Sequence, residues 1–516
     1  MKLPFDATPI LRLYARWRMK RLAGQRAGAT QERQLLSLVK RARATRFGRD
    51  HGFDDIRSVA DFQARVPLRN YAAFWDEYWK PTFPDVTDAS WPGRIPYFAL
   101  TSGTSTGRTK YIPVTREMVR SNTRAGLDLL VHHVSNRPSS RILGGKNFLL
   151  GGSIDLEELG NGVKGGDLTG ISRHEVPSWG EPFVFPDESM AREENWERKI
   201  EQTGRASLAE KITTLAGTPS WVLLFLERLT TLTGRPRRLV ELYPDLEMLV
   251  HGGLNFRPYR HVFEAWLEDS HAELREVYPA SEGFIALADR GPEDGLRVLL
   301  DSGIFYEFVP VEELESPTPT RHWISNVEPG RDYAIVLSSC AGVWGYVLGD
   351  TVRFVSLDPP RLLVTGRTSY YLSAFGEHLS GEEIEGAVID AVDALRGEVS
   401  EFAVGPLFPD AVDARGRHLF VIELREPKDL QGGPDALANE IDRRLSESNA
   451  DYETHRHEDF GMAPPHVMVV GPDCFADWMR SRGRLGGQNK VPRVIHDQEL
   501  LAGLRAHADR YEVATA

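Results

Sequence analysis

Apolar side chains follow helical spacing in several stretches of the N-terminal half. An apolar stripe predicts helix from Gln31 to about Phe74, with a break at Val66-Pro-Leu. Two further helices are expected over Arg116–His133 and Trp221–Leu229, and the second is apolar enough to be largely buried. A short apolar run, Tyr97–Leu100, precedes the first of these two helices.

From Ile304 onward the pattern changes to that of β-strands. Clusters of β-branched and aromatic residues, separated by turn residues, predict strands at Ile304–Val309, Tyr333–Leu337 and Val352–Val355. The large N-terminal region, residues 1–368, is therefore expected to be a mixed α/β domain with substantial β-sheet.

A domain boundary is expected after residue 368, because a new alternation begins there. Helical spacing returns over Ile384–Leu395 and Leu437–Leu445. Strands are expected between and after these helices, at Phe402–Val404, Leu419–Leu424 and Val467–Val470. This βαβ-like alternation predicts a small α+β domain over residues 369–516, and the chain as a whole belongs to the α/β class.

Composition narrows the class of function. A chain of 516 residues is too long for one ordinary core. Its net charge of −12 argues against a nucleic-acid partner, because no basic face would neutralise phosphates. The two cysteines, Cys340 and Cys474, form no disulfide framework and suggest a reducing, cytoplasmic compartment.

The N-terminal segment Leu11–Arg21 is basic and apolar, but no continuous apolar core follows it. It is therefore neither a secretory signal nor a transmembrane segment. A helix packed on the domain explains it better than a helix lying on a membrane surface.

The most informative segment is a loop rich in hydroxyl groups. Between Thr101 and Lys110, six hydroxyl residues, two glycines and one lysine occupy ten positions. Glycine lets the backbone approach a phosphate closely, and successive N–H groups with Ser and Thr hydroxyls form an anion-binding concavity. Lys110 adds a point charge. This segment predicts a cradle for the triphosphate of ATP.

Three other interpretations of the loop were weighed. A kinase-type P-loop fails, because Arg108 stands where the second glycine belongs. A hydrolase nucleophile elbow matches formally around Ser105, with His251-Gly-Gly as an oxyanion loop, but that loop follows the serine and Pro113 argues against an immediate helix. A plain surface loop is the third.

Two acidic motifs follow. Tyr278-Pro-Ala-Ser-Glu282 places an aromatic, a hydroxyl and a carboxylate in one short turn, where the ring can cover a purine and the carboxylate can hold Mg²⁺. Tyr346-Val-Leu-Gly-Asp350 ends in a Gly-Asp turn whose carboxylate can bind both ribose hydroxyls. Taken singly, each motif is more often structural.

Lysine is scarce in the C-terminal half. After Lys211 the chain has only Lys428 and Lys490, and the last lies in Gly486-Gly-Gln-Asn-Lys-Val-Pro-Arg493. A compact ammonium on a flexible stem suits transient contact with a moving group.

In this order, the motifs resemble the adenylate-forming superfamily. Within it, the chain is most similar to the plant auxin-responsive acyl acid amido synthetases and their bacterial relatives. Further segments that carry this resemblance are Thr45-Arg-Phe-Gly-Arg49, Gly217-Thr-Pro-Ser-Trp221, Phe305-Tyr-Glu-Phe-Val-Pro310, the Thr365-Gly-Arg hinge and Phe375-Gly-Glu-His378. The resemblance implies a small, mobile C-terminal domain.

The resemblance also implies residue roles. Tyr278 and Ser281 would contact the nucleotide, Glu282 would hold Mg²⁺, and Lys490 would neutralise the α-phosphate during adenylation. Asp350 would bind the ribose, and Arg367 would stabilise the nucleotide. The residues implied to bind the β- and γ-phosphates are Ser102, Gly103, Thr104, Ser105 and Thr106, with Lys110 nearby. The chain departs from the family pattern at two places: Thr-Ser-Tyr-Tyr follows Arg367 where an acidic hinge residue is common, and His378 replaces a frequent lysine. Both differences concern details of domain rotation.

The implied reaction is ATP-dependent activation of a carboxylic acid followed by transfer to an amine, an amino acid being expected, by a monomeric enzyme. It requires no cysteine or serine nucleophile. The alternatives are transfer to coenzyme A or another thiol, and a non-catalytic nucleotide-binding regulator. The acid and the amine are not identifiable from the sequence.

Overall fold

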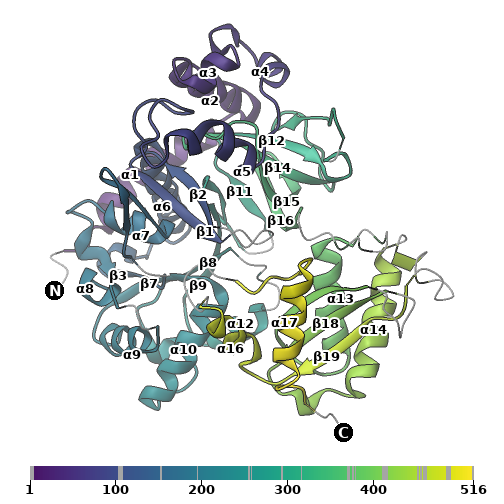
Figure 1. Cartoon of the computed structure of the whole chain (residues 1–516). Helices are drawn as coiled ribbons and strands as arrows, with labels where there is room; N and C mark the ends of the chain where they lie inside the picture. The colour runs from purple at the N-terminus through teal and green to yellow at the C-terminus, as the bar shows by residue number, and fades with distance from the viewer. Residues whose placement is uncertain are drawn as a thin grey trace. The chain divides into compact units, whose positions relative to one another are not determined.

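The polypeptide divides into two units in the computed structural model (Figure 1). The large unit comprises Met1–Ser102, Thr109–Leu348 and Val352–Val364, and the small unit contains Gly349–Thr351 and Thr365–Ala516. The structure describes residues 5–102, 109–151, 154–193, 196–253, 256, 259–291, 294–314, 316–368, 372, 374, 377, 379–408, 416–449, 452–453, 456, 462–483 and 490–513.

The N-terminal region forms short helices where one longer helical stretch was predicted. New helices begin because Thr45, Ser58 and Asn70 each accept a hydrogen bond from the backbone N–H three residues on, at 3.0, 3.1 and 3.0 Å. The helices are α1 (Thr8–Ala23), α2 (Ala27–Ala42), α3 (Arg46–Asp50), α4 (Val59–Arg65) and α5 (Tyr71–Phe74).

Helix α1 packs on the large unit through Leu11 and Ala15, which share an apolar cluster with Ala125 and Leu129. This confirms the packed helix expected from the sequence. Among the described residues, no helix has the length and apolar character needed to cross a membrane.

A four-stranded sheet carries the hydroxyl-rich segment. Its order is β2-β1-β5-β4, and β1 (Tyr97–Ser102) pairs antiparallel with β2 (Thr109–Val114). Thr115 then caps α6 (Arg116–Asn136) by accepting from Met118 N at 3.0 Å. The remaining strands of this sheet are β4 (Glu157–Gly160) and β5 (Val163–Gly166).

A twelve-stranded sheet forms most of the large unit, in the order β13-β12-β14-β15-β16-β11-β10-β9-β8-β7-β3-β6. Its parallel part consists of β3 (Lys146–Leu149), β6 (Val184–Phe185), β7 (Ile212–Gly217), β8 (Met248–Gly252) and β9 (Glu273–Ala280). The helices of this half are α7 (Leu168–His174), α8 (Glu188–Ala191), α9 (Trp196–Ser207), α10 (Pro219–Thr233), α11 (Leu239–Leu242) and α12 (Arg260–Trp266).

Helix α10 is buried as its sequence predicted. Val222, Phe225, Leu226 and Leu229 have no exposed surface, and they share a core with Leu215 and Leu249 of the neighbouring strands. The helix is therefore largely buried, with Leu224 and Arg228 exposed on its outer side.

The other half of the large sheet contains the strands predicted after Ile304. Strand β12 pairs with β14 from Ile304↔Ser339 to Pro310↔Tyr333. The strands of this half are β10 (Gly283–Leu287), β11 (Leu296–Val298), β12 (Ile304–Pro310), β13 (His322–Trp323), β14 (Asp332–Ser339), β15 (Tyr346–Leu357) and β16 (Pro360–Arg367).

The small unit is a three-stranded sheet between two helix layers. Strand β18 pairs antiparallel with β17 and parallel with β19. Alternate β18 residues face opposite ways, so Phe420 packs in one apolar cluster with Val388 and Ile441, and Val421 in the other with Leu504. The elements are α13 (Gly381–Ala394), β17 (Val399–Leu407), β18 (Arg417–Leu424), α14 (Gly433–Ser448), β19 (His466–Val470), α16 (Cys474–Ser481) and α17 (Gln498–Ala508). The predicted mixed α/β class is confirmed.

Candidate functional site

The hydroxyl-rich loop joins two paired strands. The last pairs before it are Thr101↔Lys110 and Ser102↔Thr109, so the two strands are paired up to the last described residue on each side. Gly103, Thr104, Ser105 and Thr106 lie outside the described residues. The chain continues in extended form beyond the loop to Val114, which is not the strand-to-helix turn of a nucleophile elbow.

Lys110 follows this loop on β2. Its ammonium lies 5.6 Å from the centre of the Tyr71 ring, a cation–π contact. The Tyr71 hydroxyl in turn accepts a hydrogen bond from Tyr111 N at 2.9 Å. This contact places the lysine ammonium, the charged end of the side chain, over the Tyr71 ring.

Tyr278, Ser281 and Glu282 lie at the connection between β9 and β10. Tyr278 lies near the C-terminal end of β9 and is 6% exposed, whereas Ser281 and Glu282 form the turn itself. The Glu282 side chain is also buried, and its backbone oxygen accepts a hydrogen bond from Ser339 Oγ at 3.0 Å. The predicted turn is therefore present for Ser281 and Glu282, while Tyr278 belongs to the strand.

Gly283 closes this turn in a conformation that side chains rarely adopt. Its φ is +152°, and a Cβ at this position would lie 2.5 Å from Ile304 Cδ1. The glycine therefore lets β10 begin close to β12, which fixes the position of Glu282 one residue earlier.

The parallel strands place further polar groups at the same edge. His251 near the end of β8 pairs in register with Glu276 of β9, so the two side chains leave the same face of the sheet. In open α/β sheets, ligands bind beyond the carboxyl ends of parallel strands. Tyr278 lies near that end of β9, and Glu282 follows it.

His251 is buried and stacked on Phe256, with ring centres 3.7 Å apart. Burial lowers the pKa of His251 to about 3, so the imidazole is neutral at physiological pH. Its Nδ1 has no hydrogen-bond partner among the described residues.

Glu276 was not predicted from the sequence as a site residue. Burial raises the pKa of Glu276 to about 7, although Arg260 opposes the shift. Because Glu276 precedes Tyr278 by two positions in a strand, the two residues share a face. The alternation of side chains in the strand could have placed Glu276 on the same face as Tyr278, but a single glutamate in a strand matches no functional motif.

The small unit brings three predicted site residues together: Asp350, Arg367 and Lys490. Arg367 Nε donates to Asp350 Oδ1 at 2.8 Å, and the two side chains are 35% and 14% exposed. Burial and the charge of Arg367 lower the pKa of Lys490 to about 8, and Asp350 opposes them. An anion bound at this cluster would therefore meet two cations beside one carboxylate.

The backbone around this cluster is held by local hydrogen bonds. Thr368 N donates to Gly349 O at 2.8 Å, and Thr365 and Thr351 hydroxyls lie 3.0 Å apart. The Gly-Asp turn predicted at Asp350 is wrong, because Gly349 and Asp350 both lie inside β15. Gly349 keeps a φ of +93°, which glycine adopts readily, but the pairing of β15 with β16 holds this segment in a strand.

The described residues contain no group of three or more His, Cys, Asp or Glu side chains placed to hold a metal ion. A single carboxylate suits Mg²⁺, which keeps several waters and is usually bound by one or two carboxylates plus substrate phosphates. The buried carboxylate of Glu282 fits that pattern, because hard oxygen donors are what Mg²⁺ prefers.

Both cysteines are buried and unpaired. Burial raises the pKa of each thiol to about 12, so neither is a ready nucleophile.

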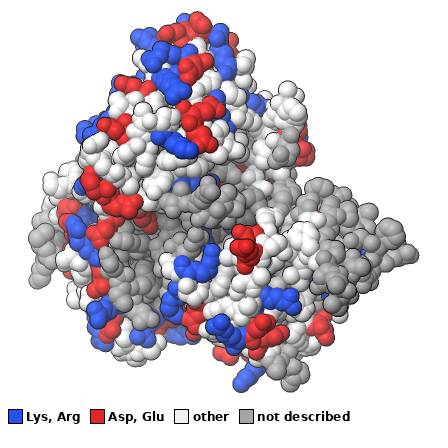
Figure 2. Space-filling model, in the orientation of Figure 1, with Lys and Arg blue, Asp and Glu red and all other residues white. Residues whose placement is uncertain are grey.

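On the face in Figure 2, cationic and acidic side chains are interspersed. Ion pairs among the described residues include Arg41–Glu117 at 3.0 Å and Arg69–Glu77 at 2.6 Å.

Comparison with known protein families gives three matches along the chain. They are the GH3 family N-terminal domain at residues 20–158, the GH3 family central domain at residues 297–367, and the GH3 family C-terminal domain at residues 382–499. Together these matches cover more than half of the chain.

Similar curated proteins come from plants. A probable indole-3-acetic acid-amido synthetase GH3.4 of Oryza sativa subsp. japonica is 24% identical over 40% of this chain and 35% of its own length. Indole-3-acetic acid-amido synthetase GH3.3 of Arabidopsis thaliana is 22% identical over 42% and 38%. The matched segment thus spans little more than a third of these relatives.

Solved structures resemble the chain over nearly its whole length. The AtGH3.15 acyl acid amido synthetase in complex with 2,4-DB has a TM-score of 0.80 at 18% identity, covering 98% of both chains. A 2-hydroxyisobutyryl-CoA ligase in complex with 2-HIB-AMP has a TM-score of 0.58 at 17% identity, covering 94% of this chain and 92% of its own. At these identities, the likeness concerns the fold.

Proposed function

The chain belongs to the GH3 family, and on that premise we propose that it activates a carboxylic acid with ATP and transfers the acyl group to an amine. The family resemblance inferred from the ordered motifs is confirmed. We infer an amine as the acceptor, because the similar plant proteins are named amido synthetases, and an amino acid in particular, because another relative is named a jasmonoyl–L-amino acid synthetase. The observation that carries the proposal is the cluster of Asp350, Arg367 and Lys490.

In the proposed first step, a carboxylate oxygen attacks the α-phosphorus of ATP, and the bond to pyrophosphate breaks. Two anions must approach each other, so the protein contributes by neutralising charge and by positioning the reactants. Lys490 would place its ammonium on the α-phosphate, and Arg367 would reinforce it. Asp350 would accept hydrogen bonds from the ribose hydroxyls.

The large unit would bind the remainder of the nucleotide. Residues 102–106 would hold the β- and γ-phosphates, with Lys110 close by. The buried ring of Tyr278 would cover the base, with Ser281 beside it. Glu282 would bind Mg²⁺, which neutralises phosphate charge when bound.

In the second step, the amine nitrogen attacks the acyl carbonyl carbon and AMP leaves with the bonding electron pair. The attacking ammonium must first lose a proton. Glu276 has a pKa raised to about 7 by burial and lies on the face of β9 that carries Tyr278, which makes it a candidate proton acceptor.

We also propose a monomeric enzyme. We propose the cytoplasm as its compartment, because two buried unpaired cysteines suit a reducing environment. Transfer to coenzyme A is the rival within the same fold, and a nucleotide-binding regulator is the rival outside catalysis.

Acid-dependent ATP–pyrophosphate exchange separates these functions. Exchange with one member of a panel of aromatic, indolic and aliphatic acids supports adenylation, and its absence from all of them despite ATP binding favours the regulator. Adding amino acids or coenzyme A to a productive acid then identifies the acceptor by the amide or thioester that accumulates.

A further inference from the structure

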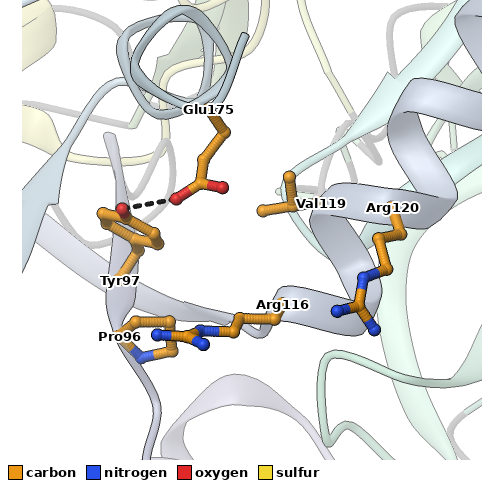
Figure 3. A pocket seen from close by; sticks show the side chains of 6 residues that line it. All are labelled: Pro96, Tyr97, Arg116, Val119, Arg120 and Glu175. Atoms are coloured by element: carbon orange, nitrogen blue, oxygen red, sulfur yellow. Dashed lines mark hydrogen bonds between the residues drawn. The ribbon is translucent and has the colours of Figure 1, made fainter. Parts of the chain in front are cut away.

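A hollow of about 350 Å³ opens on the large unit (Figure 3). It lies between the start of β1, the end of α7 and the first turns of α6. Its volume is at the lower end of the range of small-molecule sites. The lining residues are Pro96, Tyr97, Arg116, Val119, Arg120 and Glu175.

Two arginines line one wall of this hollow. Arg116 and Arg120 are four positions apart on α6 and therefore lie on the same helix face. Within the part of the chain that the structure describes, neither guanidinium forms an ion pair. Nearby arginines do so, as in Arg94–Asp85 at 2.5 Å and Arg173–Glu181 at 2.7 Å.

Glu175 and Tyr97 line another side of the hollow, and the Arg116 guanidinium lies beside Pro96 below Tyr97 (Figure 3). The Tyr97 hydroxyl donates to Glu175 Oε1 at 2.6 Å (Figure 3). Burial and this carboxylate raise the pKa of Tyr97 to about 12, so the phenol remains a donor at physiological pH. The other carboxylate oxygen, Oε2, has no hydrogen-bond partner among the described residues.

Opposite charges thus line the same hollow without pairing. A ligand that carries only negative charge would be repelled by Glu175, and one that carries only positive charge would be repelled by the arginines. A zwitterion complements both walls. Val119 and Pro96 supply apolar surface between them.

We propose that this hollow binds a free α-amino acid, with its carboxylate on Arg116 and Arg120 and its ammonium on Oε2 of Glu175. The hollow is distinct from the proposed nucleotide site. Tyr97 begins β1 and Ser102 ends it, and six residues of strand separate their Cα atoms by about 17 Å. The site therefore exists whether or not the chain forms an adenylate.

Calorimetric titration of the whole chain, without ATP or acid, tests this proposal. Neutral amino acids are titrated beside their N-acetyl derivatives, which lack the ammonium, and their amides, which lack the carboxylate. We expect saturable binding of at least one amino acid, and at least about tenfold weaker binding of both derivatives, since each loses one charged contact.

Matched variants test whether the measured heat arises from binding in this hollow. Arg120→Gln and Glu175→Gln are each expected to weaken binding at least about tenfold. The second keeps an oxygen that accepts from Tyr97, which favours an intact fold. Arg228→Gln, at an exposed arginine of α10 outside the hollow, should leave the affinity unchanged.

Three results would overturn the proposal: no saturable heat with any amino acid, equal affinity for the N-acetyl derivative, or full affinity in both hollow variants. Lys490→Ala distinguishes this proposal from the proposed function. Binding that survives in Lys490→Ala belongs to the hollow, whereas binding that needs ATP and acid and disappears in that variant belongs to the reaction centre and contradicts the proposal.

Discussion

Lys490 is the residue on which the proposed chemistry depends most. Its environment lowers its pKa, although its proposed task requires the charged form. The ammonium is therefore only partly populated near pH 8 in the free protein, and an anionic phosphate beside it would favour protonation. Nucleotide binding and proton uptake are linked on this account.

The first prediction concerns the pH profile of exchange. Protonated Lys490 predominates below pH 8 and is lost as the pH rises through that value, so kcat/KM for ATP should fall tenfold per pH unit above about pH 8. The corresponding falling limb of the pH profile of kcat should lie at higher pH, because bound phosphate stabilises the ammonium. Lys490→Arg retains charge and should remove the limb; an unchanged limb in that variant would assign it to another group.

The second prediction uses the neighbours of Lys490. Arg367 lowers the pKa of Lys490 and Asp350 raises it, so Arg367→Gln should move the limb to higher pH and Asp350→Asn to lower pH. Both variants also weaken nucleotide binding, so the position of the limb is compared rather than the rate. Shifts in the same direction would show that the three side chains do not interact as described.

For single residues, the sequence identified the side chains of the proposed site better than the neighbours that shift their pKa. The scarcity of lysine marked Lys490, and the ordered motifs marked Asp350 and Arg367, but nothing in the sequence indicated that Arg367 would lower the pKa of Lys490. Glu276 was missed for the same reason, since its altered pKa comes from burial between strands that are distant in sequence.

Among the elements, the turn between β9 and β10 has the strictest requirement. Gly283 takes a φ of +152° and packs against Ile304. Helix α6 contains a contrasting glycine, Gly126, where a Cβ would meet nothing within 4 Å.

The third prediction is that the same substitution has opposite effects at these two positions. Gly283→Ala should destabilise the fold by about 1–3 kcal/mol and reduce exchange, because it strains the turn that holds Glu282. Gly126→Ala should stabilise it by about 0.5–1 kcal/mol through helix propensity. Urea unfolding measures both, and equal effects at the two positions would contradict the described turn.

Helix α1 is attached by a buried ion pair. Arg18 donates to Asp128 at 2.6 Å and to Asp301 at 2.7 Å, and the side chains of Arg18 and Asp128 are 3% and 2% exposed. Burial alone would raise the pKa of Asp301, but hydrogen bonds and charge from Arg18 outweigh it and lower the pKa. This stabilisation is present at neutral pH and is lost as the pH falls through the lowered pKa.

The fourth prediction follows from this burial. Arg18→Ala should destabilise the large unit by about 3–5 kcal/mol, because Asp128 remains buried without its partner. Arg16→Ala, at an exposed position of the same helix, should change stability by less than about 0.5 kcal/mol. Thermal or urea unfolding at neutral pH compares them, and a similar small effect of both would contradict a buried pair.

Prediction of elements from sequence succeeded where an apolar run or stripe is buried, and it failed where strand pairing or helix capping decided the outcome. Helices α6 and α10 and strands β12 and β14 were expected from their apolar residues. The division of the Gln31–Phe74 region depends on single capping hydroxyl and amide groups, and the extended state of Asp350 depends on a long strand partner.

At the scale of the whole molecule, the change in residue pattern predicted a boundary after residue 368, whereas the small unit begins at Thr365 and also contains Gly349–Thr351. Each unit has its own core. The order of strands in the twelve-stranded sheet was beyond the sequence, because it depends on pairings between distant segments, such as β16 with β11. The hollow bounded by Arg116 and Glu175 likewise arises only when α6 and α7 flank β1.

The central claim is that the chain forms an acyl-adenylate, with Lys490 acting on the α-phosphate. The most direct measurement is ATP–pyrophosphate exchange over the acid panel, for the parent chain and for Lys490→Ala. We expect exchange with at least one acid, and a loss of at least about a hundredfold in the variant while ATP binding persists. Exchange that continues at the parent rate in Lys490→Ala would contradict it.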